Sequence, residues 1–160
     1  MSQSLSQPQT ANLTPGELAA WRGLLRAHAA LVKVLDGELE AAHDLPLSSY
    51  EVLLTLEQQQ LRMCDLAESV LLSRSGLTRL IDRLERDGLV ERRSCEDDAR
   101  GAYAVLTTAG RAKLGAARET HLAGVREHFL ERLSGADLAV MASFWERLAL
   151  TPAATEAGCG

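Results

Sequence analysis

Potential hydrogen-bond donors gather on one face of a helix predicted from Ser73 to Asp87. Hydroxyl and guanidinium groups at helical spacing are suited to contacting the phosphates and base edges of duplex DNA. The donors on this face are Ser73, Arg74, Ser75, Thr78, Arg79 and Arg83. The other face is an apolar stripe formed by Leu77, Leu80, Ile81 and Leu84. The pattern predicts an amphipathic helix that packs on a core with one side and can enter a major groove with the other.

A predicted β-hairpin follows this helix directly. Residues 89–93 and 102–106 have strand composition, and the charged segment between them is too long for a tight turn. The hairpin adds the cations Arg92, Arg93 and Arg100, and Asp98 lies where it could pair with an arginine. An arginine at a hairpin tip can enter the minor groove, so Arg93, Asp98 and Arg100 join the candidate DNA-binding residues. On an isolated helix the polar face would more often be solvated surface, and the adjacent wing is what favours DNA.

Predicted helices before this unit must position it. Thr14, Pro15 and Glu17 form a capping-box signature, and a leucine stripe extends the helix to about residue 42. Ser48 with Glu51 predicts a second capping box and a short helix ending near residue 58. A strand at 61–63 and a short helix over 64–70 then lead to the cap at position 73.

Predicted helices also follow the wing. Gly88 has the position of a left-handed helix end, and Thr107 and Thr108 offer caps for a helix with an apolar stripe out to Leu133. Ser134 and Asp137 start the last helix. We expect a mainly α fold with one small hairpin.

Composition and charge limit the possible functions. The 160 residues carry a net charge of −5 and a pI near 5.4, so DNA binding must depend on local geometry rather than on bulk charge. Residues Cys64, Cys95 and Cys159 are too few for a disulfide framework, and we expect reduced thiols. No apolar run approaches the ~20 residues that span a bilayer, and no signal peptide is evident, which favours a cytoplasmic protein. No residue cluster has catalytic or metal-ligand spacing, so we expect neither an enzyme nor a cofactor.

Two segments carry a resemblance to a known family. The pattern Asp98-Ala99-Arg100-Gly101, followed by Leu106-Thr107 and Gly110, resembles the wing of the MarR family of bacterial transcription regulators. The segment around Ser73-Arg74-Ser75-Gly76-Leu77-Thr78-Arg79-Leu80, with Gly88-Leu89-Val90, resembles the family's helix-turn-helix. The resemblance covers about Leu18 to Leu148. It implies a winged helix-turn-helix in a homodimer that binds a palindromic operator in double-stranded DNA.

The resemblance also implies a division of the chain. Residues 14–47 and 108–150 would form a helical dimerisation region, and residues 48–107 the DNA-binding lobe. Composition predicts a disordered arm over 1–13 and a flexible tail over 151–160.

A small-molecule effector is the third implication of the resemblance. Many members release DNA on binding an anionic aromatic ligand, in a pocket between the dimerisation region and each lobe. Trp21, His28 and Tyr50 would border such a pocket. Core packing for Trp21 and a satisfied polar contact for His28 are the alternative interpretations.

The leading hypothesis is therefore a repressor released by a small ligand. One alternative is a helical dimerisation or protein-interaction module without DNA binding, which the acidic balance favours. Another is a thiol-redox-responsive regulator. The family's peroxide-sensing branch has a reactive cysteine near the start of the first helix, where this chain has none. Whether Cys64 or Cys95, on the wing, is redox-active stays open.

Overall fold

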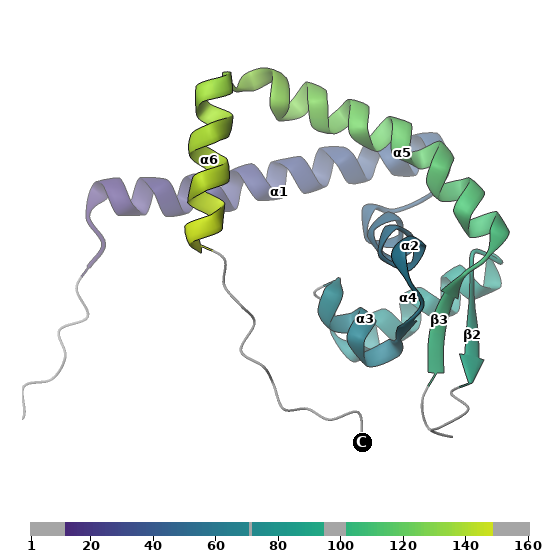
Figure 1. Cartoon of the computed structure of the whole chain (residues 1–160). Coiled ribbons are helices and arrows are strands. Elements are labelled where there is room, and N and C mark those ends of the chain that lie inside the picture. The colour runs from purple at the N-terminus through teal and green to yellow at the C-terminus, as the bar shows by residue number, and fades with distance from the viewer. Residues whose placement is uncertain (1–11, 71, 95–101, 149–160) are drawn as a thin grey trace, which may run out of the picture.

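The predicted mainly α architecture is confirmed by the structure, a computed structural model that describes residues 12–70, 72–94 and 102–148. In chain order the elements are α1 (Pro15–His43), α2 (Leu47–Gln58), β1 (Leu61–Arg62), α3 (Met63–Ser69), α4 (Arg74–Arg86), β2 (Val90–Ser94), β3 (Ala102–Leu106), α5 (Thr108–His128), a 3-10 turn (Leu130–Arg132) and α6 (Gly135–Leu148) (Figure 1). The predicted tail, most of the predicted arm and the wing residues Asp98 and Arg100 lie outside the described residues.

The three strands form one small antiparallel sheet in the order β1-β3-β2. In the hairpin, Val90 pairs with Leu106 and Ser94 with Ala102, while Leu61 of β1 pairs with Ala104. The second and third strands therefore form the base of the predicted wing, and β2 is an edge strand.

A single hydrophobic core joins the end of α1, helices α2 to α4, the hairpin and the start of α5. The predicted apolar stripe of α4 is buried along its whole length. Other fully buried core residues are Leu39, Leu53, Leu66, Val90 and Leu114. Burial of this stripe fixes which face of α4 remains outside.

Helices α1 and α5 run side by side, and α1 extends well past the winged lobe (Figure 1). A Cβ at Gly124 of α5 would lie 2.8 Å from Leu35 Cδ2 and 2.3 Å from Glu38 Oε2, so glycine permits the close approach of the helices. The pair is also joined by polar contacts, His128 Nε2 to Glu38 Oε1 at 2.5 Å and His43 Nε2 to Thr120 Oγ1 at 2.8 Å.

Four predicted helix starts are confirmed by side-chain caps. Thr14 Oγ1 accepts from Glu17 N at 3.3 Å, and Ser73 Oγ accepts from Gly76 N at 3.1 Å. The same kind of bond caps the other two helices. Gly110 N donates to Thr107 Oγ1 at 2.9 Å at the start of α5, and Asp137 N donates to Ser134 Oγ at 3.2 Å at the start of α6. After α4, Gly88 has the predicted positive φ, +71°.

Two predicted helix boundaries are wrong. Helix α2 begins at Leu47 with Pro46 in the cap position, so Ser48 is not its cap. The N–H of Leu47 instead donates to Asp36 Oδ1 of α1 at 2.8 Å. The helix predicted to reach Leu133 ends at His128, and a 3-10 turn follows.

Cys64, at the start of α3, is disulfide-bonded. The expectation of reduced thiols is therefore wrong for this residue, and the other two cysteines lie outside the described residues. Its Sγ lies 3.5 Å from Asp65 Oδ1.

None of the helices in the described ranges is both long enough and apolar enough to cross a bilayer.

Candidate nucleic-acid interface

The helix-turn-helix is formed by α3 and α4. The two helices pack against each other, and Ala67 of α3 is buried, as expected for a small residue where two helices cross closely. The N–H of Leu72, in the turn, donates to the carbonyl of Ala67 at 3.1 Å. This turn sets the start of α4 at Ser73, with its cap and first turn at the surface.

The first half of α4 presents the predicted donor face to solvent. The five residues Ser73, Arg74, Ser75, Thr78 and Arg79 are all exposed. Thr78 Oγ1 donates to the carbonyl of Arg74 at 2.9 Å, and Arg79 Nε donates to the carbonyl of Ser75 at 3.3 Å. These bonds stay within the helix, so they orient the side chains on its surface.

Arg83 differs from the other candidates on α4. Its Nη2 donates to Ser49 Oγ of α2 at 3.1 Å, and Ser49 is only 1% exposed. Arg83 also borders a cleft of about 290 Å³, whose other charged lining residues are Glu40, Asp44, Asp87 and Lys113. The structure thus places Arg83, which is exposed overall, as a link between α4 and α2.

The two wing arginines in the described part of β2 have opposite environments. The side chain of Arg93 is 62% exposed, and its Nε donates to Glu91 Oε1 at 2.7 Å. The side chain of Arg92 is 27% exposed and is bound by Asp82 and Glu85 of α4. Sequence reasoning named Arg92 among the cations of the wing without making it a DNA-binding candidate, and it missed this cluster. The spacing of Asp82 and Glu85 does predict a shared helix face, but not what that face contacts.

The pKa of Arg92 reflects that cluster. Burial by itself would lower the pKa, and the hydrogen bonds and charges of Asp82 and Glu85 outweigh burial, so the pKa lies above its ordinary value. Asp82, Glu85 and Glu91 are all bound to arginines, so these three acids are engaged within the fold.

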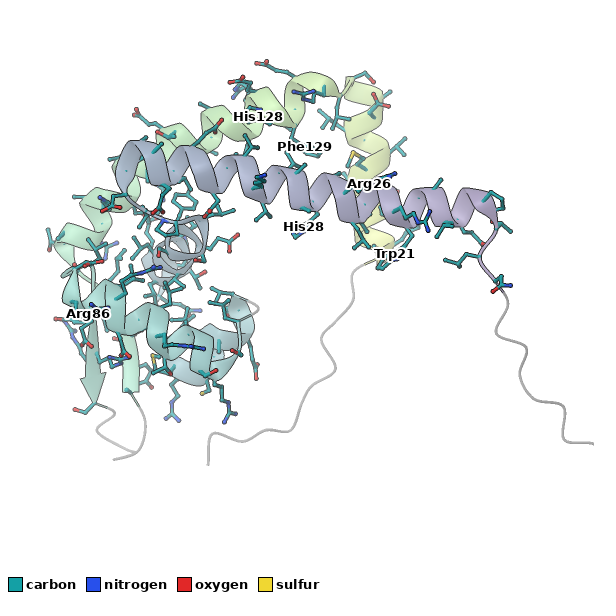
Figure 2. The ribbon with its side chains drawn as sticks, turned by 180° about the vertical axis from the view of Figure 1, so that it is seen from behind. Trp21, Arg26, His28, Arg86, His128 and Phe129 are labelled. Carbon is teal, nitrogen blue, oxygen red and sulfur yellow. The ribbon has the colours of Figure 1, made fainter. Side chains whose placement is uncertain are left out.

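The three candidate ligand residues do not meet in one cavity of the single chain. Trp21, which is 53% exposed, and the exposed His28 lie on the part of α1 that extends past the lobe (Figure 2). Core packing of Trp21 within one chain is therefore wrong. Tyr50 is buried, 2% exposed, with its ring centroid 4.5 Å from that of His121. None of the three predicted residues lines the cleft beside Arg83.

Burial shifts the pKa values of two titratable groups near Tyr50. Burial lowers the pKa of His121, whose buried Nδ1 has no hydrogen-bond partner among the described residues. Burial raises the pKa of Glu51, and the charge of His28 acts in the opposite direction. The junction of α2 with α1 and α5 is thus a partly desolvated polar site.

Within the residues that the structure describes, no three His, Cys, Asp or Glu side chains come close enough to hold a metal ion.

Known proteins share both the sequence pattern and the fold. A family model described as MarR family matches residues 43–101. The structure of AbsC, a MarR family transcriptional regulator from Streptomyces coelicolor, is 35% identical, with a TM-score of 0.80, over 88% of this chain and 96% of that one. Sco3205, a MarR family transcriptional regulator from the same organism solved in complex with DNA, is 30% identical, with a TM-score of 0.84, over 92% and 95%.

A mutant MarR from E. coli complexed with operator DNA is 20% identical, with a TM-score of 0.76, over 88% of this chain and all 100% of that one, a likeness of fold alone. No curated protein sequence matches the chain.

Proposed function

Because this chain belongs to the MarR family of transcriptional regulators, we propose that it binds duplex DNA as a homodimer and represses transcription until a small aromatic or anionic ligand releases it. The observation that carries the proposal is the exposed donor face at the start of α4, held beside the base of a wing. The DNA complex of Sco3205, a relative at 30% identity, supports the same use of this fold.

In the proposed complex the first half of α4 enters a major groove, which is about 12 Å wide. The small residues Ser73 and Ser75 let the helix approach closely, and Arg74, Thr78 and Arg79 contact bases and phosphates. Arg93 contacts the sugar-phosphate backbone of the DNA. Asp98 and Arg100, which lie outside the described residues, act at the wing tip. Arg83 contributes less, since it is bound to Ser49.

Dimerisation is proposed to use residues 14–47 and 108–150, with residues 48–107 as the DNA-binding lobe. Helix α6 buries no residue in the single chain, and α1 buries only Leu35 and Leu39. Large apolar side chains on these helices are accordingly well exposed: Trp21, Leu25 and Val32 on α1, and Phe144, Trp145 and Leu148 on α6. Such an apolar surface favours a second copy as its partner. Two α4 helices would then contact half-sites about one turn of DNA apart.

The effector is proposed to bind where the dimerisation region meets the lobe, bordered by Trp21, His28 and Tyr50. The ring of the buried Tyr50, on α2 of the lobe, packs against the partly buried ring of His121, on α5 of the dimerisation region. A ligand that altered this packing would change the angle of the lobe and hence the spacing of the two α4 helices. Candidate aromatic acids added during operator mapping test this part of the proposal.

The test of DNA binding is footprinting on the intergenic DNA that flanks the gene, followed by affinity measurements over a range of salt concentrations. Arg79→Ala should change the sequence preference, and Arg100→Ala should weaken binding to all sequences and reduce the salt slope by about 1. Arg126→Ala, at an exposed arginine of α5, is the matched control and should bind like wild type. Absence of binding at low salt would instead favour an interaction module without DNA binding.

A further inference from the structure

Arg92 lies in the middle of β2, and its side chain turns toward α4. Its Nη2 donates to Asp82 Oδ1 at 2.5 Å and lies 3.5 Å from the carbonyl oxygen of Thr78, while Nη1 donates to Glu85 Oε2 at 2.5 Å. Thr78, Asp82 and Glu85 follow one another at spacings of four and three residues, so they share one face of α4. One guanidinium therefore joins the wing strand to about two turns of α4, the proposed recognition helix.

The main chain of Arg92 takes part in the same contact. Because β2 is an edge strand, alternate N–H groups along it point away from β3 and have no partner in the sheet. The N–H of Arg92 donates to Glu85 Oε1 at 3.1 Å. One oxygen of Glu85 thus binds the main chain of Arg92 and the other binds its side chain. Together the two bonds hold β2 against α4.

The cluster carries no net positive charge. Two carboxylates face one guanidinium, so the three side chains sum to −1 and leave no positive charge for a phosphate. The adjacent Arg93 differs, because successive residues of a strand point to opposite faces. Its side chain binds Glu91 of its own strand and remains mostly exposed. Arg92 and Arg93 therefore have the same charge and adjacent positions but different partners.

We propose that Arg92 is a positioning residue that fixes the wing against the recognition helix, with Asp82 and Glu85 as its anchors. The two DNA-contacting elements then form one preorganised unit. Without the cluster, the wing and α4 would have to be ordered relative to each other during binding, at a cost in affinity. The consequence for DNA rests on the proposed function, whereas the contact itself does not.

The first experiment measures hydrogen–deuterium exchange of the β2 amides in the free protein. Arg92→Gln and Arg93→Gln remove the same charge from neighbouring residues. Arg92→Gln should accelerate exchange about tenfold, because charge-assisted hydrogen bonds that close the strand edge are lost. Arg93→Gln should stay within about twofold of wild type.

Glu85→Ala should reproduce the effect of Arg92→Gln, and the double variant should exchange no faster than the more affected single variant. Equal exchange in wild type and Arg92→Gln would refute the proposed role.

The second experiment measures affinity for the mapped operator and for unrelated DNA across salt concentrations. Arg92→Gln should weaken operator binding about tenfold and lower the ratio of specific to non-specific affinity, with the salt slope unchanged. A salt slope reduced by about 1, with equal loss on all sequences, would show a phosphate contact and overturn the proposal, as would unchanged affinity.

Two further comparisons keep these tests decisive. Arg92→Lys retains the charge but lacks the planar guanidinium that binds both carboxylates, so an intermediate loss is expected. If Arg92→Gln does not fold, Arg92→Lys replaces it in both experiments. Wild-type protein that binds no DNA would refute the proposed function, while the exchange measurements would still decide whether Arg92 fixes the wing.

Discussion

Substitution of Gly110 by alanine should destabilise the protein by blocking the approach of α5 to the base of the wing. An ideal Cβ at Gly110 would lie 2.1 Å from the carbonyl oxygen of Leu89 and 2.7 Å from Leu106 Cδ1. A backbone carbonyl cannot move aside as easily as the end of a flexible side chain can. The carbonyl of Leu89 also accepts from Thr107 N at 3.1 Å, so displacement of this carbonyl strains the bond that anchors the cap of α5.

The expected magnitude follows from opposing contributions. Overpacking costs about 1–3 kcal/mol, and loss of a backbone hydrogen bond adds about 1 kcal/mol. Alanine returns up to about 1 kcal/mol because it favours the helix over glycine. The net loss should be about 1–3 kcal/mol of unfolding free energy, a fall in Tm of roughly 3–10 °C for a chain of this size.

Gly115→Ala, in the same helix, is the matched control. No atom lies within 4 Å of a Cβ at that position, so only the helix-propensity gain applies and Tm should rise by about 2–4 °C. Thermal unfolding followed by circular dichroism at one fixed protein concentration measures both changes, because the proposed dimerisation would make Tm depend on concentration. A Gly110→Ala protein as stable as wild type, or stabilised like Gly115→Ala, would refute the assigned close approach.

Two other predictions concern stability. Ser73→Ala removes the acceptor for Gly76 N and should lower the unfolding free energy by about 1 kcal/mol in urea; an unchanged midpoint would mean that the cap contributes nothing. Burial lowers the pKa of His121 below its ordinary 6.5, so as the pH falls below 6.5 the unfolded chain takes up a proton before the folded chain does. Wild-type stability should therefore fall from pH 6.5 downward until the folded-state pKa is passed, and His121→Phe, which keeps a ring against Tyr50, should lose less stability over that range; identical losses would contradict the assignment.

Local sequence signals identified most helix starts, because a cap and its N–H partner lie within one turn of each other. Thr14, Ser73, Thr107 and Ser134 all act as expected. The same reasoning failed at Ser48, because the N–H of Leu47 is satisfied by Asp36, 11 residues earlier on another helix. A capping signature does not reveal that a distant side chain already holds the backbone.

At the candidate site, too, local patterns were predictable from the sequence and contacts between distant residues were not. The amphipathic pattern from Ser73 to Arg79 determined which face of α4 is exposed, since the apolar stripe had to be buried. The pattern could not separate the arginines that remain on that face from those bound elsewhere. Arg83 binds Ser49, 34 residues away in sequence, and so joins α4 to α2.

The sequence by itself determined the helix-turn-helix, the wing strands and the exposed donor face, because each depends on periodicity and contacts between near neighbours in the chain. Only the tertiary structure decided the role of each charge. Arg92 and Arg93 are equivalent by composition, yet one is bound to two carboxylates of α4 and the other is exposed on the opposite face of β2. The physical reason is that an ion pair depends on distance in space, which the packing of the hairpin against α4 sets.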